Sequence, residues 1–212
     1  MKELRKALVI FNPKKPYAKK LAADVRAFLA ANGASATGGA SEADALIIVS
    51  GDGTLLYNKS RYGLPIFAIG SKRSFICQAH QGNWKKKLLR ILRRGFSTEK
   101  RAMLSCEVGG KKLEDALNEV VIRSRDHRVI DIELKVGKKN FSFFADGVLF
   151  STPTGSTAYC YSCGGSELPK SARKYGVVAI APYRRAFKPV VVPESTVSSA
   201  RTRSRKADLV FD

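Results

Sequence analysis

Hydroxyl-bearing side chains crowd one short run of this chain, STPTGSTAY at Ser151–Tyr159. A hydroxyl both donates and accepts hydrogen bonds, and a glycine lets a ligand approach the backbone closely. The run therefore predicts a site for sugar hydroxyls or phosphate oxygens. The alternative is a Ser/Thr-rich turn that caps a helix beginning near Ser156. The hydroxyls concerned are those of Ser151, Thr152, Thr154, Ser156 and Thr157.

A glycine turn that carries a carboxylate follows the apolar run Ala45–Val49, which is typical of a buried parallel strand. The turn reads SGDGT over Ser50–Thr54 and opens a predicted helix through Lys59. A strand, a glycine turn and a helix N-terminus together predict an anion site, because free N–H groups point at the ligand. Asp52 would repel an anion there unless it binds a metal or takes a proton from a substrate hydroxyl. The alternative is a solvated Asp in a turn.

These motifs, taken together, resemble the NAD kinase family, whose members phosphorylate NAD to NADP with ATP or polyphosphate. The resemblance rests on GDGT at Gly51–Thr54, on Asn118-Glu119 and on STPTGSTAY with the following Gly164-Gly165, in matching order over roughly Leu8–Asp212. GDGT is shared with diacylglycerol, sphingosine and 6-phosphofructo-kinases, so it indicates only the superfamily. The TPTGSTAY element is much more specific.

The resemblance implies roles for the residues of the glycine turn. Asp52 would be the base that orients the 2′-hydroxyl of the adenosine ribose, and the backbone N–H groups of Gly51, Gly53 and Thr54 would hold donor phosphates. Mg²⁺ or another divalent cation would enter with ATP or polyphosphate, since the sequence shows no closed metal cage.

The dinucleotide contacts implied by the resemblance lie in the second half of the chain, with the NAD bound in a cleft between two domains. Asn118 would read the adenine, Glu119 would accept hydrogen bonds from a ribose, and Asp146 would contact the nicotinamide half. A homodimer or homotetramer is also implied, because a neighbouring subunit supplies part of this site in related enzymes. The remaining contacts would come from Thr154, Thr157, Ala158, Tyr159 and Ser162.

Three departures from the family pattern bear on these roles. Ser50 stands where the family has the first glycine of the turn, so its φ must stay permissible for a residue with a side chain. Gly70–Phe75 (GSKRSF) replaces a glycine-richer loop, and Lys72 and Arg73 could substitute there as phosphate ligands. The chain ends at Asp212, where relatives continue, so we expect a minimal enzyme or an edge completed by a partner.

Two alternative functions stay open. One is a lipid or sugar kinase of the same superfamily, and the other is a non-catalytic, basic dinucleotide- or nucleic-acid-binding module. The chain carries 38 Lys and Arg against 18 Asp and Glu, a formal net charge of +20. The cations are spread along the chain, from Lys85–Lys87 to Arg201–Arg205, so proteome bias and attraction for polyanionic substrates are favoured over a dedicated nucleic-acid site.

The cysteines and histidines suggest no further chemistry. Cys77-x-x-His80 and Cys160-x-x-Cys163 have zinc-ligand spacing, but a buried small-residue role is favoured for these cysteines. We expect His127 to be exposed. No apolar run of membrane-spanning length and no cleavable signal is visible, so the sequence predicts a cytoplasmic protein without a membrane partner.

The elements that must position these residues fall into two classes. Strands and helices alternate in the first half, which predicts a Rossmann-like α/β domain over residues 1–98. Strands dominate the second half, which predicts a mainly-β domain over residues 99–212 with turns at Gly109-Gly110 and Gly137–Asn140. The first-half elements are predicted at Ala7–Phe11 (strand), Tyr17–Ala31 (helix), Ala45–Val49 and Ile66–Ile69 (strands) and Trp84–Arg94 (a basic amphipathic helix, alternatively a membrane-surface helix). The second-half strands are predicted at Met103–Val108, Glu119–Arg123, Val129–Val136, Phe141–Phe150, Val177–Ala181 and Val190–Val192.

Overall fold

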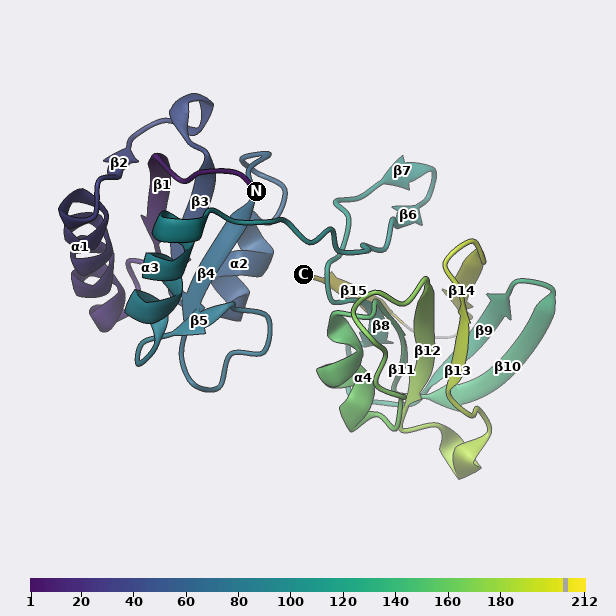
Figure 1. Ribbon diagram of the computed structural model, residues 1–212. Coiled ribbons are helices and arrows are strands. Elements are labelled where there is room, and N and C mark those ends of the chain that lie inside the picture. Colours follow the sequence, from purple (N-terminus) through teal and green to yellow (C-terminus); the bar gives the residue numbers. More distant parts are fainter. Residues whose placement is uncertain (204–205) are drawn as a thin grey trace. The chain divides into compact units, whose positions relative to one another are not determined.

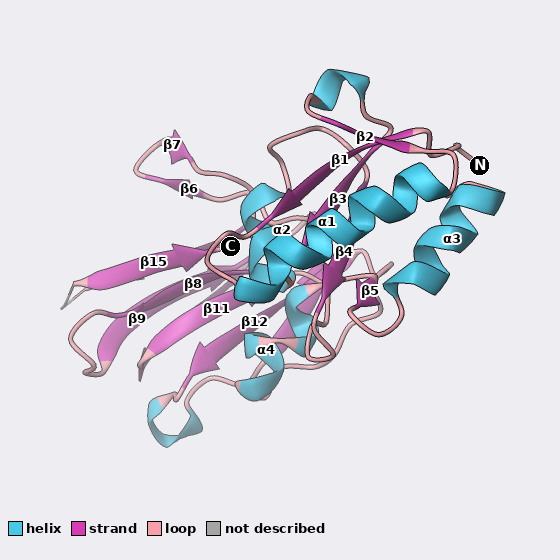
Figure 2. Ribbon diagram, turned by 90° about the vertical axis from the view of Figure 1, so that its left-hand side faces the viewer, coloured by secondary structure: helices cyan, strands magenta, loops and turns pink. Residues whose placement is uncertain are grey.

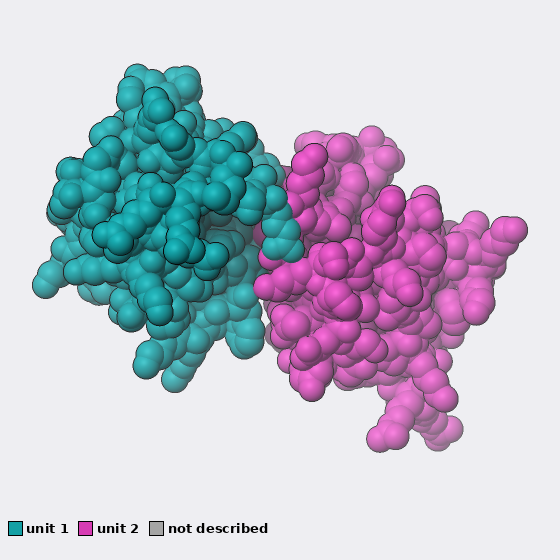
Figure 3. All heavy atoms as spheres, viewed as in Figure 1, with its two compact units in different colours: residues 1–99 teal, residues 100–212 magenta. Residues whose placement is uncertain are grey.

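The computed structural model of the chain describes residues 1–203 and 206–212 (Figure 1). They form two compact units, Met1–Glu99 and Lys100–Asp212, which Figure 3 shows in two colours. The boundary predicted from the sequence falls one residue earlier. The basic cluster noted at Arg201–Arg205 includes Ser204 and Arg205, which lie outside the described residues.

The first unit is built on a five-stranded parallel sheet with the strand order β2-β1-β3-β4-β5. From β1 the chain adds β2 on one side and β3 on the other, so the strand order reverses between β1 and β3. Ligands of open α/β sheets bind outside the carboxyl ends of the strands at such a reversal. The strands are β1 (Lys6–Phe11), β2 (Ser35–Thr37), β3 (Ala45–Val49), β4 (Ile66–Gly70) and β5 (Ala79–His80).

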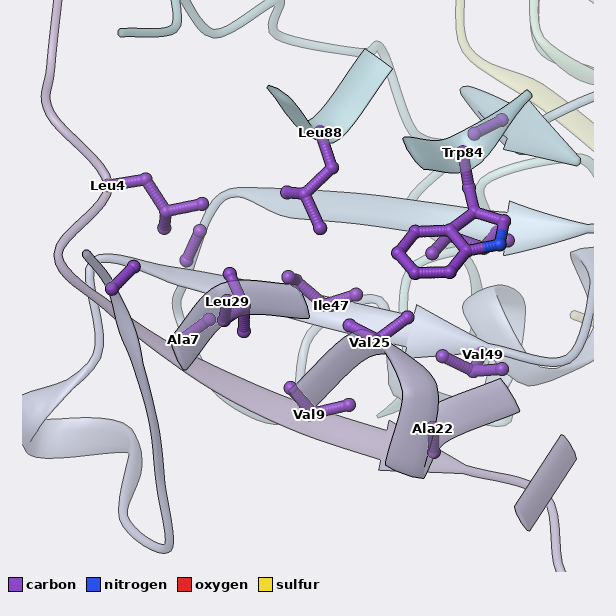
Figure 4. Packing of buried hydrophobic residues seen from close by; sticks show 14 of the residues in the cluster. Leu4, Ala7, Val9, Ala22, Val25, Leu29, Ile47, Val49, Trp84 and Leu88 are labelled. Carbon is purple, nitrogen blue, oxygen red and sulfur yellow. The ribbon is translucent and has the colours of Figure 1, made fainter. Parts of the chain in front are cut away.

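Helices cover both faces of this sheet (Figure 2). Helices α1 (Pro16–Ala31) and α3 (Trp84–Arg94) share one face, where Leu29 and Leu88 pack with Ile47 of β3 (Figure 4). Helix α2 (Asp52–Asn58) buries Leu55 on the other face, and a short 3₁₀ turn, η1 (Ala40–Glu42), precedes β3. All five residues of β3 are buried, as expected for a parallel strand covered on both faces.

Helix α3 uses its apolar stripe for the domain core. Trp84 and Leu88 are buried, and the Trp84 ring meets Phe28 of α1 edge-on with 5.3 Å between the ring centroids. The membrane-surface alternative is therefore not needed to explain the stripe. Within residues 1–203 and 206–212, no helix combines the length and the apolar character needed to cross a bilayer.

The second unit is mainly antiparallel β-structure. A five-stranded sheet has the order β13-β12-β11-β8-β15, a three-stranded sheet has the order β10-β9-β14, and β6 pairs with β7 in a hairpin. The three helical turns are η2 (Gly155–Thr157), α4 (Tyr159–Ser162) and η3 (Tyr183–Arg185). The strands are β6 (Glu107–Val108), β7 (Lys111–Lys112), β8 (Glu119–Ser124), β9 (Ile130–Val136), β10 (Lys139–Ala145), β11 (Gly147–Ser151), β12 (Lys174–Ile180), β13 (Val190–Pro193), β14 (Ser198–Thr202) and β15 (Ala207–Phe211).

The predicted fold class, an α/β unit followed by a mainly-β unit, is confirmed, but two predicted strands are wrong. Phe141–Phe150 is two strands, because β10 pairs with β9 whereas β11 pairs with β8 and β12, so the chain changes sheets at Asp146. Met103–Val108 forms only β6 and a single bridge at Leu104, since Met103 and Val108 have no core to face and are exposed.

The core role of α3 gives a first prediction. Leu88→Ala should lower the free energy of unfolding by about 2–5 kcal/mol, because it deletes a fully buried side chain and leaves a cavity. Lys86→Ala, on the exposed side of the same helix, is the control and should change it by less than about 0.5 kcal/mol. Urea unfolding followed by circular dichroism measures both. Equal stability of the two variants would contradict the packing of Leu88 in the core.

Candidate functional site

The glycine turn after β3 stands at the carboxyl end of the parallel sheet. Gly51 has φ 143° and ψ −176°, a conformation that residues with a side chain rarely adopt. Ser50 is not among the described non-glycine residues with positive φ, so it fits the turn without backbone strain. The Tyr17 hydroxyl donates to the Ser50 carbonyl at 2.5 Å and ties α1 to the turn.

Asp52 is the first residue of α2, and its carboxylate holds the loop that follows β4. Three consecutive backbone N–H groups donate to it, from Phe75 to Oδ2 at 2.7 Å and from Ile76 and Cys77 to Oδ1 at 3.2 and 3.1 Å. Lys72 and Arg73 are exposed on the same loop. The glycine turn at residues 50–54 and the loop after β4 are therefore joined by hydrogen bonds. Their separation of more than 20 residues in the sequence gave no sign of this contact.

The N–H groups of the turn are not equally available to a phosphate. The Thr54 N–H donates to the Gly51 carbonyl at 3.1 Å, so the expected role of this group in binding a phosphate needs correction. The N–H groups of Asp52 and Gly53 lie in the first turn of α2, where a helix offers no partner four residues earlier.

Lys15 is a candidate residue that the sequence reasoning missed. Its Nζ lies 3.9 Å from where a Cβ on Gly51 would be, and Lys14 and Lys15 end the turn between β1 and α1. This turn and the glycine turn flank the point where the strand order reverses. Two lysines that follow the first strand after Asn12-Pro13 and precede the first helix were the signal available in the sequence.

The second unit has its own candidate site, at the start of β8. Asp212, which directly follows β15, accepts three consecutive N–H groups, from Leu117 at 2.7 Å, Asn118 at 2.8 Å and Glu119 at 3.0 Å. These bonds fix the backbone that carries the two predicted nucleoside contacts. Asp212 had no motif around it that could have marked this role.

Three of the five hydroxyls of the Ser/Thr run bond the protein's own backbone, and none of these three belongs to a residue expected to contact the dinucleotide. Thr152 Oγ1 donates to the Leu117 carbonyl at 2.5 Å, and Ser151 Oγ contacts the Asn118 carbonyl at 3.4 Å. Ser156 Oγ donates to the Pro153 carbonyl at 2.9 Å. All three side chains are buried. The helix-capping alternative holds for one hydroxyl, because Thr152 Oγ1 accepts the N–H of Gly155, the first residue of η2, at 3.1 Å. The N-cap residues themselves, Thr154 of η2 and Ala158 of α4, make no side-chain cap.

Gly155 lets this run close onto the Asn118 backbone. A Cβ at Gly155 would lie 2.2 Å from the Asn118 carbonyl oxygen and 2.6 Å from its carbonyl carbon. Both are backbone atoms, which cannot rotate away from an added Cβ as the end of a flexible side chain can. The glycine of TPTGSTAY is therefore required by a close approach of two backbones, and it links this motif to Asn118-Glu119.

A cavity of ≈ 250 Å³ opens beside this junction, and its walls combine charged, aromatic and apolar groups. Glu119 lines this cavity, whereas Asn118 precedes it in the chain and is not one of the lining residues. Among the described residues, the buried oxygens Asn118 Oδ1 and Glu119 Oε2 have no hydrogen-bond partner. Such groups are costly to bury unless a ligand or water satisfies them. The lining residues are Glu119, Val121, Arg123, Tyr159, Val210, Phe211 and Asp212.

The remaining predicted contacts are distributed as follows. Tyr159 lines the cavity, whereas Thr154 is buried and is not one of the lining residues. Thr157 and Ser162 are exposed and Ala158 is half-buried. Asp146 is exposed at the corner between β10 and β11, and its backbone is fixed by a bond from its N–H to the Ile180 carbonyl at 2.9 Å. A larger cavity, of ≈ 510 Å³, runs along β9, β10 and β14 and contains none of these residues.

Neither titrating residues nor cysteines supply a metal cage. In the described part of the chain, no three side chains of the His, Cys, Asp or Glu types gather as metal ligands. Cys160 packs with Val121 and Leu149 as a small apolar residue, and burial raises the pKa of its thiol. His127 is exposed, as predicted.

Burial raises the pKa of Glu119 to about 7, with a smaller contribution from the negative charge of Asp212. Folding therefore favours the protonated acid, and its stabilisation is lost as pH rises from the ordinary value near 4.5 through 7. At neutral pH this carboxyl can either donate or accept a hydrogen bond.

This pKa shift predicts a pH-dependent effect of Glu119→Gln. The variant should match wild type near pH 5 and be more stable by about 2 kcal/mol at pH 8, because glutamine stays neutral. Urea unfolding at the two pH values measures the difference, with the exposed Glu167→Gln as control. A constant difference between Glu119→Gln and wild type at both pH values would contradict the burial of this carboxyl.

The close approach at Gly155 predicts that Gly155→Ala destabilises the second unit by about 1–3 kcal/mol or more and weakens ligand binding at the cavity. Gly176→Ala is the matched control, because its Cβ would meet only Cys160 Sγ at 3.4 Å. Thermal unfolding of both variants checks this, and an unperturbed Gly155→Ala protein would show that the two backbones are not tightly apposed.

The chain is similar in sequence to known proteins. A family model described as "ATP-NAD kinase C-terminal domain" matches residues 117–212. The chain is similar to the NAD kinase of Treponema denticola, with 32% identity over 214 residues that cover 91% of this chain and 75% of that one.

Two solved structures share the fold. One is an NAD kinase from Archaeoglobus fulgidus in complex with ATP, with TM-score 0.79, 24% identity, and coverage of 98% of this chain and 84% of that one. The other is a yeast NADH kinase complexed with NADH, with TM-score 0.83, 20% identity, and coverage of 100% and 76%. At these identities the two likenesses concern the fold.

Proposed function

The chain belongs to the NAD kinase family, and we propose that it transfers a phosphoryl group from ATP or polyphosphate to the 2′-hydroxyl of the adenosine ribose of NAD, giving NADP. The observation that carries the proposal is the cavity at the start of β8, which Glu119 lines, together with two buried side-chain oxygens, one of Glu119 and one of the adjacent Asn118, that have no partner among the described residues. Both belong to the Asn118-Glu119 pair singled out in the sequence.

The chemistry of the cavity suits a nucleoside. The Asn118 side chain offers an acceptor and donors to a base edge, and the Glu119 carboxyl can bond a ribose hydroxyl. The Tyr159 ring lines the same cavity and supplies a flat apolar face for a base. Arg123, also in the wall, brings a positive charge that favours a phosphate-bearing ligand. The side chains of Thr157, Ala158 and Ser162, together with Asp146, are proposed to complete the dinucleotide contacts.

Phosphoryl transfer itself needs in-line positioning and neutralisation of charge. In the proposed step the 2′-oxygen forms a bond to the terminal phosphorus of the donor, the bond to the leaving phosphate breaks, and the hydroxyl proton passes to the Asp52 carboxylate. The N–H groups of Gly51, Asp52 and Gly53 are proposed to hold the donor phosphates. Lys72 and Arg73 are proposed to add charged contacts to the same phosphates. Lys15 joins this set because of its distance from Gly51.

Mg²⁺ is proposed to arrive with the donor. The described residues form no acidic cluster that would hold it alone, and the Asp52 oxygens already accept three N–H groups. A divalent ion that arrived with the donor would supply neutralisation of the charge on its phosphates, since such ions prefer oxygen ligands. A homodimer or homotetramer, which the family resemblance implies, and a cytoplasmic location, which the sequence predicts, complete the proposal.

The similarity to known NAD kinases favours this function over a lipid or sugar kinase of the same superfamily. The non-catalytic alternative makes a different prediction, namely NAD binding without NADP formation. An assay with NAD, Mg²⁺ and either ATP or polyphosphate therefore separates all three functions, provided that lipid and sugar acceptors are tested alongside.

The role of Asp52 predicts that Asp52→Asn lowers kcat for NADP formation by about 10²–10⁴-fold, the usual contribution of a general base. Asp44→Asn is the matched control, because Asp44 also accepts two backbone N–H bonds, at 2.8 Å each, from Arg5 and Lys6. It should leave kcat within about twofold of wild type. Equal turnover by wild type and Asp52→Asn would refute the role of Asp52.

A further inference from the structure

The loop after β4, residues 71–77, is a compact turn with bonds of its own. The Ser74 N–H donates to the Ser71 carbonyl at 3.1 Å, and the Ser71 N–H donates to Ser74 Oγ at 3.1 Å. The Arg73 N–H donates to Ser71 Oγ, also at 3.1 Å. These short-range bonds shape the loop but do not attach it to the rest of the unit.

Two glycines make room for the loop against the turn after β3. A Cβ at Gly70 would lie 2.6 Å from Ser74 Cβ and 2.9 Å from Cys77 Sγ. A Cβ at Gly51 would lie 3.4 Å from Ser74 Oγ. The Ser74 side chain therefore occupies space that a side chain at Gly70 or Gly51 would fill. Gly70 ends β4, and Gly51 follows the carboxyl end of β3.

The Asp52 carboxylate is the attachment between these two segments. Its oxygens accept the N–H groups of Phe75, Ile76 and Cys77, and hydrogen bonds to an ionised acceptor are about twice as strong as neutral ones. Burial, and to a smaller extent the adjacent Asp52, raise the pKa of the Cys77 thiol to about 12, and the Cys77 side chain is half-buried next to the carboxylate.

The carboxylate keeps capacity for a substrate. An ionised carboxylate has about four lone-pair sites, and the backbone N–H groups use two on Oδ1 and one on Oδ2. The Cys77 thiol makes a further side-chain hydrogen bond to the same carboxylate, so a substrate hydroxyl that bonds Asp52 would take the place of the thiol and not of a backbone N–H group. Holding the loop and accepting a proton from a substrate are thus compatible in one side chain.

We propose that Asp52 is a positioning residue as well as the base: in the substrate-free protein it anchors loop 71–77 to the glycine turn, and so fixes the backbone that carries Lys72 and Arg73. One part of the inference rests on the proposed function, namely that Lys72 and Arg73 bind a phosphate of the donor. The anchoring itself is a property of the first unit alone.

Hydrogen exchange of the substrate-free protein, read by mass spectrometry, tests the anchoring directly. In Asp52→Asn the amide NH₂ faces an N–H donor, so exchange at residues 75–77 should rise at least about tenfold, while peptides from β1 and β3 stay as in wild type. Asp44→Asn is the control. It should speed exchange at residues 5 and 6 and leave residues 75–77 unchanged.

A second variant disturbs the loop without touching the carboxylate. Gly70→Ala should displace Ser74, raise exchange at residues 75–77 and raise KM for the phosphoryl donor more than it lowers kcat. Gly38→Ala is its control, because a Cβ there would meet no atom within 4 Å. Trypsin should also cleave after Lys72 and Arg73 faster in Gly70→Ala and Asp52→Asn than in either control.

The outcomes separate the two proposals. If Asp52→Asn abolishes NADP formation while exchange at residues 75–77 stays at the wild-type rate, the anchoring is overturned and the proposed function stands. If exchange rises as expected but no NADP forms even with wild-type protein, the anchoring stands and the proposed function fails. Unchanged exchange and cleavage in both Asp52→Asn and Gly70→Ala would also overturn the anchoring.

Discussion

A carboxylate that accepts three consecutive backbone N–H groups organises each of the two candidate sites. Asp52 gathers residues 75–77 in the first unit, and Asp212 gathers residues 117–119 in the second. In both places the captured segment carries the side chains proposed to touch a ligand, or lies next to them. Hydrogen bonds to an ionised acceptor are among the stronger ones in proteins, and they fix a loop without using a strand or a helix.

In the second unit, side chains of the sequence motifs likewise hydrogen-bond the backbone of a neighbouring segment. Thr152 and Ser151 direct their hydroxyls at the backbone of Leu117 and Asn118, and Gly155 closes the gap between the two segments. The conspicuous run of hydroxyls thus shapes the cavity, while its walls are lined by residues such as Arg123 and Phe211 that no motif marked. Among the described residues, one side-chain oxygen each of Asn118 and Glu119 is buried without a partner, which is costly unless a ligand or water satisfies it.

Charge plays a different part. The net charge of +20 is carried by residues distributed over both units, and on α3 the cations lie on the exposed side opposite the buried Trp84 and Leu88. Such a surface attracts polyanions over long range. The recognition of a particular ligand depends instead on the few polar groups that the loops hold in place, as at Asn118 and Glu119.

Local sequence was sufficient for the elements whose residues are buried in a regular pattern. The predicted strand Ala45–Val49 and the predicted helix Trp84–Arg94 match β3 and α3 residue for residue. The first is a short continuous apolar run, and the second has apolar residues at helical spacing. Short or polar strands such as β5, β14 and β15 showed no such pattern, and the continuous run Phe141–Phe150 hid a change of sheets at Asp146.

By itself, then, the sequence determined the fold class, the family and the identity of most proposed contact residues, since these depend on residue type and spacing along the chain. Only the tertiary structure decided which polar side chains hydrogen-bond the protein's own backbone and which are available to a ligand. Ser151, Thr152 and Ser156 cannot be told from Thr157 by residue type, and Asp212 has no motif at all. Their roles depend on partners that lie up to 95 residues away, and a hydrogen bond is set by distance in space, which no local pattern encodes.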